Sequence, residues 1–142
     1  MNHLGREHFK AFSAGSHPRG EVHTMTLEVL SGQSYDVDGL RSKSWTEFAQ
    51  SDAPQMDFVF TVCDQAAGEA CPAWPGQPIT AHWGFADPAA VLGEREQRLK
   101  AFRSAQSQIA NRIRLFLSLP IDKIDRISLQ TRLRELGRQR DA

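Results

Sequence analysis

The heptapeptide DFVFTVC, residues 57–63, carries the strongest indication of the fold. It is a short, unbroken apolar run rich in valine and phenylalanine. Such runs are typical of strands that are covered on both faces, as in a parallel sheet. A weaker strand is predicted at residues 79–83, and a short one at residues 9–12, which the turn residues 13–16 end. We expect residues 57–63 to be the most buried of these three strands.

Helical patterns fill the intervals between these strands. Residues 24–30 carry a weak amphipathic pattern, and the capping box Ser44-x-x-Glu47 predicts a short helix through Phe48. From Glu94 the apolar residues recur at helical spacing until Pro120 ends the helix. This stripe, which should face the sheet, is Leu99, Phe102, Ile109, Ile113 and Phe116. Strands alternating with helices predict an α/β fold with a mainly parallel sheet.

The last helix is predicted beyond Pro120, with Gly137 where a C-cap glycine belongs. Its apolar positions are Ile124, Ile127, Leu133 and Leu136. We therefore divide the chain into an α/β domain at residues 1–119 and a C-terminal amphipathic helix extension at residues 120–142. At the other end, Leu4-Gly5 resembles a helix C-cap although only four residues precede the glycine.

Composition narrows the classes of protein to consider. The 142 residues, 40% hydrophobic and 24% charged, suit one globular domain. A formal net charge of zero gives no overall footprint for nucleic acid, although residues 103–142 hold nine Lys/Arg against four acids. The chain has neither a secretory h-region nor an apolar run of about 18 residues. We expect a cytoplasmic protein, with no membrane partner, whose cysteines stay reduced.

The two cysteines, Cys63 and Cys71, pose the main chemical question. If residues 64–70 were helical, the two Cα atoms would lie about 12 Å apart, whereas a disulfide needs roughly 4.4–6.8 Å. A bond between them would therefore require the segment to rearrange, as in a redox switch. The alternative is a pair of thiols that pack as small hydrophobic residues. No histidine is spaced from them as in a zinc motif, so no metal site is expected.

The segment HWGFADP, residues 82–88, follows the strand predicted at residues 79–83. Loops at the carboxyl ends of parallel strands line the active sites of open α/β sheets. Pro88 restricts the backbone of Asp87, which would hold a carboxylate in place for general acid or base work. An ordinary Asp-Pro turn beside a packed His82-Trp83 pair explains the pattern equally well.

Several segments together resemble the bacterial arsenate reductases built on the low-molecular-weight tyrosine phosphatase fold. They are SAGSHPRG (13–20), RSKSW (41–45), FTVCDQAAGEACPAWPGQP (60–78) and HWGFADPAA (82–90). FLSLP (116–120) and RLRELGR (132–138) are similar to the proteobacterial branch of the family. The resemblance implies a three-layer sandwich, no bound cofactor, and arsenate as the substrate.

The resemblance also implies residue roles. Asp87 matches the aspartate that protonates the departing oxygen, and Cys63 and Cys71 match the cysteines that receive the oxidising equivalents. Ser13, Gly15, His82, Trp83 and Pro88 would form the supporting loops. The thiol reductant implied is glutathione with glutaredoxin, or thioredoxin. The seven residues between the cysteines and the FLSLP tail lean towards the glutathione-coupled kind.

The sequence departs from the family's pattern at its start. Family members begin with a strand and a C-x5-R-S phosphate-binding loop, and this chain contains no C-x5-R motif. We therefore expect a fold without its first strand and that loop, and a chain that is inactive alone. The segment could be encoded upstream, or the chain could be a non-catalytic remnant acting as a binding protein. A phosphatase relative is the alternative enzyme, because both chemistries share the loop and the acid.

Overall fold

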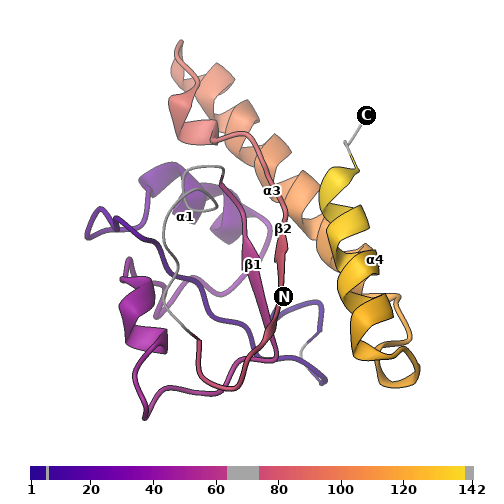
Figure 1. Cartoon of the computed structure of the whole chain (residues 1–142). Helices are drawn as coiled ribbons and strands as arrows, with labels where there is room; N and C mark the ends of the chain where they lie inside the picture. The colour runs from indigo at the N-terminus through magenta and orange to yellow at the C-terminus, as the bar shows by residue number, and fades with distance from the viewer. Residues whose placement is uncertain (6, 64–73, 140–142) are drawn as a thin grey trace.

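The fold is built around two parallel strands, β1 (Phe58–Thr61) and β2 (Ile79–His82). The computed structural model describes residues 1–5, 7–63 and 74–139. Phe58 is in register with Ile79, and Thr61 with His82. The α-helices of the described residues are α1 (Thr24–Gly32), α3 (Arg95–Leu117) and α4 (Arg126–Arg138), and Figure 1 shows α4 beside β2. The predicted α/β class, with parallel strands and packed helices, is confirmed.

The third predicted strand, at residues 9–12, is wrong for the described part of the chain, whose sheet has two strands. The Asn2 side chain takes the place of a neighbouring strand at Ala11. Its Oδ1 accepts from Ala11 N at 2.6 Å, and its Nδ2 donates to Ala11 O at 2.9 Å. The chain forms only an isolated bridge further on, between Gly15 and Ser44. The turn at Leu4-Gly5 is closed by Gly5 N donating to Met1 O at 2.7 Å.

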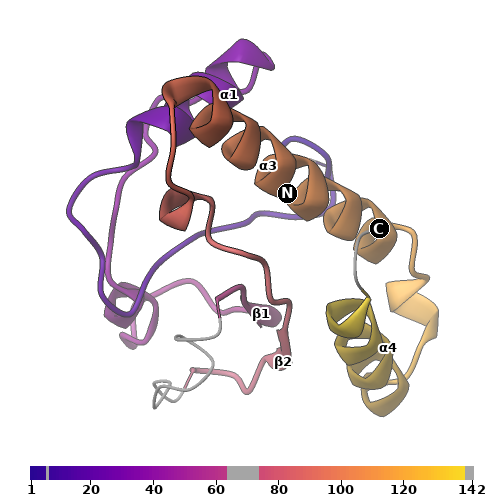
Figure 2. The ribbon, with the colours of Figure 1, turned by 90° about the horizontal axis from the view of Figure 1, so that it is seen from above.

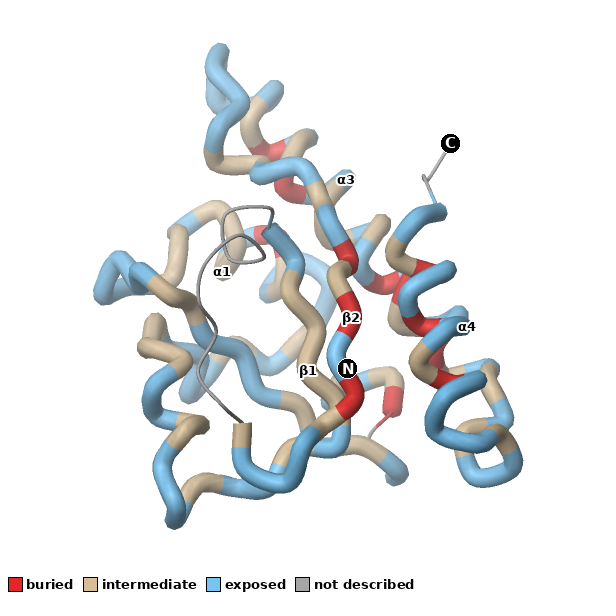
Figure 3. The backbone as a smooth tube through the Cα atoms, in the orientation of Figure 1, coloured by how far each residue is buried: buried red, intermediate tan, exposed pale blue. Residues whose placement is uncertain are grey.

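The more buried of the two strands is β2, contrary to the prediction for residues 57–63. Ile79 and Ala81 are buried in β2, whereas all four residues of β1 are half-buried. Figure 3 shows β2 between β1 and α4, and among the described helices none packs on β1 as closely as α4 packs on β2. The apolar run therefore predicted the position of the strand correctly, but it did not predict how far the strand is buried.

Helix α3 joins two hydrophobic clusters, so the prediction that its apolar stripe faces the sheet is confirmed only in part. Leu99 and Phe102 are buried with Val29 of α1, and Phe116 packs against the rings of β1. Figure 2 shows α3 passing from α1 to the far side of the molecule, near α4. Ile109, however, is exposed, and Arg112 is buried instead. The helix begins with a capping box between Glu94 and Gln97.

Helix α4 packs on β2 through three leucines, Leu129, Leu133 and Leu136. Ile127, expected on the same face, is 79% exposed. Gly137 is not the C-cap glycine that was predicted, because it lies inside the helix and Gln139 is the C-cap residue. A Cβ at Gly137 would stand 2.1 Å from the carbonyl oxygen of His82. Glycine is therefore required there by the close approach of helix to strand, a use that spacing alone does not reveal.

Short 3-10 helices complete the fold: η1 (Trp45–Phe48), η2 (Pro88–Ala90) and η3 (Ile121–Lys123). The helix predicted after Ser44 is present as η1, with the Ser44 hydroxyl accepting from Thr46 N at 3.2 Å. Glu47 does not complete the capping box, since its carboxylate forms a two-bond ion pair with Arg41. Among the described helices, none combines the length and the apolar character that crossing a membrane requires.

Candidate active site at the carboxyl ends of the strands

The two chemically interesting loops leave the sheet side by side. Because β1 and β2 are parallel, their carboxyl ends lie at the same edge. Backbone hydrogen bonding continues beyond the strands, with Trp83 N donating to Thr61 O at 2.7 Å. Phe85 N then donates to Val62 O at 3.0 Å. Val62, which precedes Cys63, is thus hydrogen-bonded to Phe85, which lies two residues before Asp87.

Cys63 lies just beyond β1, where the strand gives way to a bend, and it is exposed. The preceding residue, Val62, is also 48% exposed, so Cys63 does not have the packed environment that the alternative of a small hydrophobic thiol implies. Exposure is one of the two conditions that a reactive cysteine needs, the other being a positive local field. Cys71, its predicted partner, lies outside the described residues.

Asp87 is held at the start of η2 in the way the Asp-Pro sequence predicts. Its Oδ1 accepts from Ala89 N at 2.9 Å, and Pro88 occupies the first helical position. The carboxylate is exposed, and within the described residues Oδ2 makes no hydrogen bond. One oxygen therefore positions the carboxylate of this exposed residue. That arrangement can donate a proton to, or accept one from, a molecule bound at this edge.

His82 and Trp83 connect the site to the core. The His82 Nδ1 lies 2.8 Å from the Thr61 hydroxyl, across the two strands. Trp83 is buried, its ring stacks on Phe60 with centroids 3.9 Å apart, and its Nε1 donates to Leu133 O at 3.0 Å. Trp83 is therefore a packing residue that joins the site loop to α4, and His82 ties the two strand ends together.

The remaining predicted supporting residues, Ser13 and Gly15, belong to another segment. Gly15 N donates to Lys43 O at 3.0 Å, and Gly15 O accepts from Trp45 N at 3.0 Å. Ser13 is exposed. Within the described residues, no hydrogen bond joins this segment to Asp87. Nor do the described residues gather three or more His, Cys, Asp or Glu side chains as a metal site would.

Sequence reasoning missed Arg112, which supports the loop after β2. Its guanidinium lies 5.1 Å from the centroid of the Phe85 ring, and its Nη2 donates to Gln139 O at 2.8 Å. A cation over an aromatic face is an attractive contact, and here it is buried. The missed signal was its position four residues before Phe116, which places both side chains on one face of α3.

Comparison with known proteins agrees with this geometry. The family model for low molecular weight phosphotyrosine protein phosphatases matches residues 1–126. The chain therefore belongs to this family. It is 32% identical over 114 residues to an arsenate reductase of Halalkalibacterium halodurans, covering 80% of this chain and 78% of that protein. An arsenate reductase of Bacillus subtilis is 30% identical over 115 residues, covering 80% and 78%. One of Shouchella clausii is 42% identical over 60 residues, which is 42% of each chain.

Proposed function

We propose that this chain serves arsenate reduction with thiols, releasing arsenite in the reducing environment of the cytoplasm. The main support is its similarity to proteins named arsenate reductase over four-fifths of its length. A second support is that backbone hydrogen bonds join the segment before Cys63 to the segment before Asp87 at one end of the sheet. Overall, arsenate and two thiols give arsenite, one disulfide and water. The arsenic accepts the electron pair that the thiols lose.

In this proposal Asp87 protonates the oxygen that leaves arsenic as water. Its anchored Oδ1 and the exposure of the residue suit that transfer. Cys63 then attacks the sulfur of the arsenic-bearing cysteine, which expels arsenite with the bonding electrons. Cys71 attacks the resulting disulfide and becomes joined to Cys63. An external reductant, glutathione with glutaredoxin or thioredoxin, restores the thiols. The FLSLP tail of the proteobacterial branch favours glutathione.

The arsenic-bearing cysteine of the family's pattern is in a C-x5-R loop, and the 142 residues contain no such motif. Backbone N–H groups and an arginine are the donors that stabilise charge developing on a bound oxyanion. We therefore expect no arsenate-dependent thiol oxidation by the 142-residue chain with either reductant. Arsenite production by this purified chain above the protein-free rate would show that the reaction does not require the C-x5-R loop, and would contradict this expectation.

A second experiment adds the missing C-x5-R motif and tests whether activity appears. A strand–C-x5-R-S–helix segment of the family's pattern is joined ahead of Met1, and arsenite release is measured with glutathione and glutaredoxin or with thioredoxin. We expect the fusion to reduce arsenate and Cys63→Ser to abolish turnover. Asp87→Asn should lower the rate by about 10²–10⁴-fold, the usual contribution of a general acid. A folded fusion without arsenate-dependent thiol oxidation would defeat the proposal.

Phosphatase activity is the second candidate, favoured by the description of the family model that matches the chain. The same fusion distinguishes the two activities. A phosphatase needs the nucleophile and the acid but not Cys63. If the fusion hydrolyses p-nitrophenyl phosphate, if Cys63→Ser leaves that rate unchanged, and if arsenate elicits no thiol oxidation, then the phosphatase function holds.

A further inference from the structure

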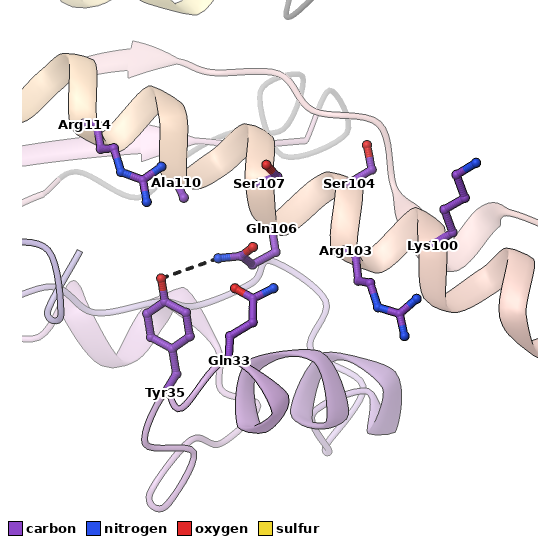
Figure 4. A pocket seen from close by; sticks show the side chains of 9 residues that line it. All are labelled: Gln33, Tyr35, Lys100, Arg103, Ser104, Gln106, Ser107, Ala110 and Arg114. Carbon is purple, nitrogen blue, oxygen red and sulfur yellow. Dashed lines mark hydrogen bonds between the residues drawn. The ribbon is translucent and has the colours of Figure 1, made fainter.

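A pocket away from the carboxyl ends of the strands lies between α3 and the segment that follows α1. Its volume is about 550 Å³, within the range of small-molecule sites. Figure 4 shows the side chains that line it. They are Gln33, Tyr35, Lys100, Arg103, Ser104, Gln106, Ser107, Ala110 and Arg114. Three of them are cations, five carry hydroxyl or amide groups, and none is an acid.

Helix α3 carries a net positive charge, although the chain as a whole has a formal net charge of zero. Arg95–Leu117 contains six Lys/Arg (95, 98, 100, 103, 112 and 114) and one acid, Glu96, a net charge of +5. No acid occurs between Ser104 and Leu117. A surface lined by one sign of charge raises the local concentration of oppositely charged ligands. Arg95 pairs with Glu28, and Arg112 does not line the pocket. The charged residues that do line it are all cations, so the lining is positive although the protein is neutral.

Little in the described structure neutralises the cations of the pocket. Arg103 pairs with Glu96 at 3.0 Å, but both side chains are more than half exposed. Such exposed pairs are weak and exchange readily with a competing anion. Arg114 donates to the neutral Asn111 Oδ1 at 3.0 Å and so keeps its full charge. No ion pair involving Lys100 is present among the described residues.

The cations stand at the two ends of a neutral, polar middle. Lys100 and Arg103 lie near one end and Arg114 near the other, with Arg103 and Arg114 about 16 Å apart along the helix axis at 1.5 Å per residue. Gln106 extends between them, its Nε2 3.5 Å from the Tyr35 hydroxyl. In Figure 4 the two arginines and Gln106 extend to the side of α3 where Gln33 and Tyr35 lie.

We propose that this pocket binds a small compound with two or more phosphate groups. Guanidinium groups match the paired oxygens of phosphate, and the amides and hydroxyls of the middle donate to further oxygens. Because the cations come from positions on different turns of α3, a ligand with several phosphate groups can contact more of them than a single tetrahedral ion can. This site does not depend on the arsenate chemistry proposed above, because it uses none of the strand-end residues.

The test is calorimetric titration of the 142-residue chain with orthophosphate, pyrophosphate and tripolyphosphate. We expect one-to-one binding of tripolyphosphate that weakens with added salt and is at least about tenfold tighter than binding of orthophosphate. Arg103→Gln and Arg114→Gln should each weaken it by about tenfold or more. Arg132→Gln, at an exposed position of α4, is the matched control and should leave it unchanged.

Three results would overturn the proposal. They are no saturable binding of tripolyphosphate, an equal loss in Arg132→Gln, and an affinity that does not rise from orthophosphate to tripolyphosphate. Circular dichroism of each variant establishes that it is folded before it is titrated. Because arsenate turnover is not a readout here, failure of this proposal and failure of the proposed function are distinguishable.

Discussion

Two aspartates at helix starts show how the same local motif serves different ends. Asp87 uses one carboxylate oxygen to cap η2, whereas Asp125 uses both to cap α4. The Ser128 N–H donates to Asp125 Oδ1 at 3.0 Å, and its hydroxyl donates to Oδ2 at 2.8 Å. These bonds, the backbone one first, lower the pKa of Asp125 below its ordinary value of 3.8. Asp125 is thus a structural cap, while Asp87 keeps an oxygen available for chemistry.

The depressed pKa of Asp125 predicts a pH-dependent stability. Because the folded pKa lies below the unfolded one, the stabilisation is complete above pH 3.8 and is lost as pH falls through the folded value. Asparagine caps helices about as well as aspartate but does not titrate. We expect Asp125→Asn to melt close to the parent at neutral pH, and the small remaining difference to shrink below pH 3.8.

Thermal unfolding of both proteins, from neutral pH to well below 3.8, measures this difference. Asp125→Ala is the companion variant, and it should melt lower than both at neutral pH because it removes the cap. If the difference between the parent and Asp125→Asn stays constant down the whole pH range, the carboxylate bonds to Ser128 contribute no pH-dependent stability.

At the scale of elements, the close packing of α4 on β2 holds the carboxyl end of β2 in place, and the loop that contains Asp87 begins there. Gly137 makes this contact possible, because any Cβ there would collide with the His82 carbonyl. Trp83 adds its hydrogen bond to the α4 backbone at Leu133. The helix therefore positions the beginning of the site loop, and a change in the seating of α4 should reach the loop through His82 and Trp83.

Replacing Gly137 by alanine tests this contact. In an ordinary helix interior the change stabilises by up to about 1 kcal/mol, through helix propensity. Here we expect the opposite sign, a loss of about 1–3 kcal/mol, because backbone must move to relieve the overlap. The matched control is Gly32→Ala in α1, where nothing lies within 4 Å of the added carbon. Urea unfolding gives both values, and stabilisation by Gly137→Ala would contradict the packing described.

The sequence predicted the elements better than it predicted their surroundings. Hydrophobic periodicity and capping residues located α1, β1, β2 and α3, because these signals are local. The false strand at residues 9–12 failed because a strand exists only through its neighbour, and Asn2 binds Ala11 instead. Burial of Arg112 and the role of Gly137 depend on contacts between distant segments. No periodicity in a single sequence contains that information.

The site was predicted in the same uneven way. The Asp-Pro cap at residues 87–88 follows from two adjacent residues and is present as expected. Trp83 belongs to the core, and Phe85 donates a hydrogen bond to Val62. Predicting either contact would have required knowledge of the sheet register. The predicted partnership of Cys63 with Cys71 stays a prediction, since Cys71 lies outside the described residues.

At the scale of the whole molecule, one end of the two strands brings together an exposed thiol and an anchored carboxylate. The reaction also requires a positive loop that binds the oxyanion, and the C-x5-R motif that forms it in the family does not occur in these 142 residues. The positive region that the structure does describe lies along α3, and we propose a different ligand for it. The redox pairing of Cys63 and Cys71 is the claim on which the arsenate function depends most.

The most direct measurement is peptide mass spectrometry of the 142-residue chain after mild oxidation, with hydrogen exchange over residues 64–70. We predict a disulfide between Cys63 and Cys71 within the monomer, together with changed exchange in that segment. Bridged cysteines need their Cα atoms roughly 4.4–6.8 Å apart, so the intervening residues must accommodate the bond. Oxidation that yields only intermolecular dimers, or no Cys63–Cys71 peptide, would contradict the account.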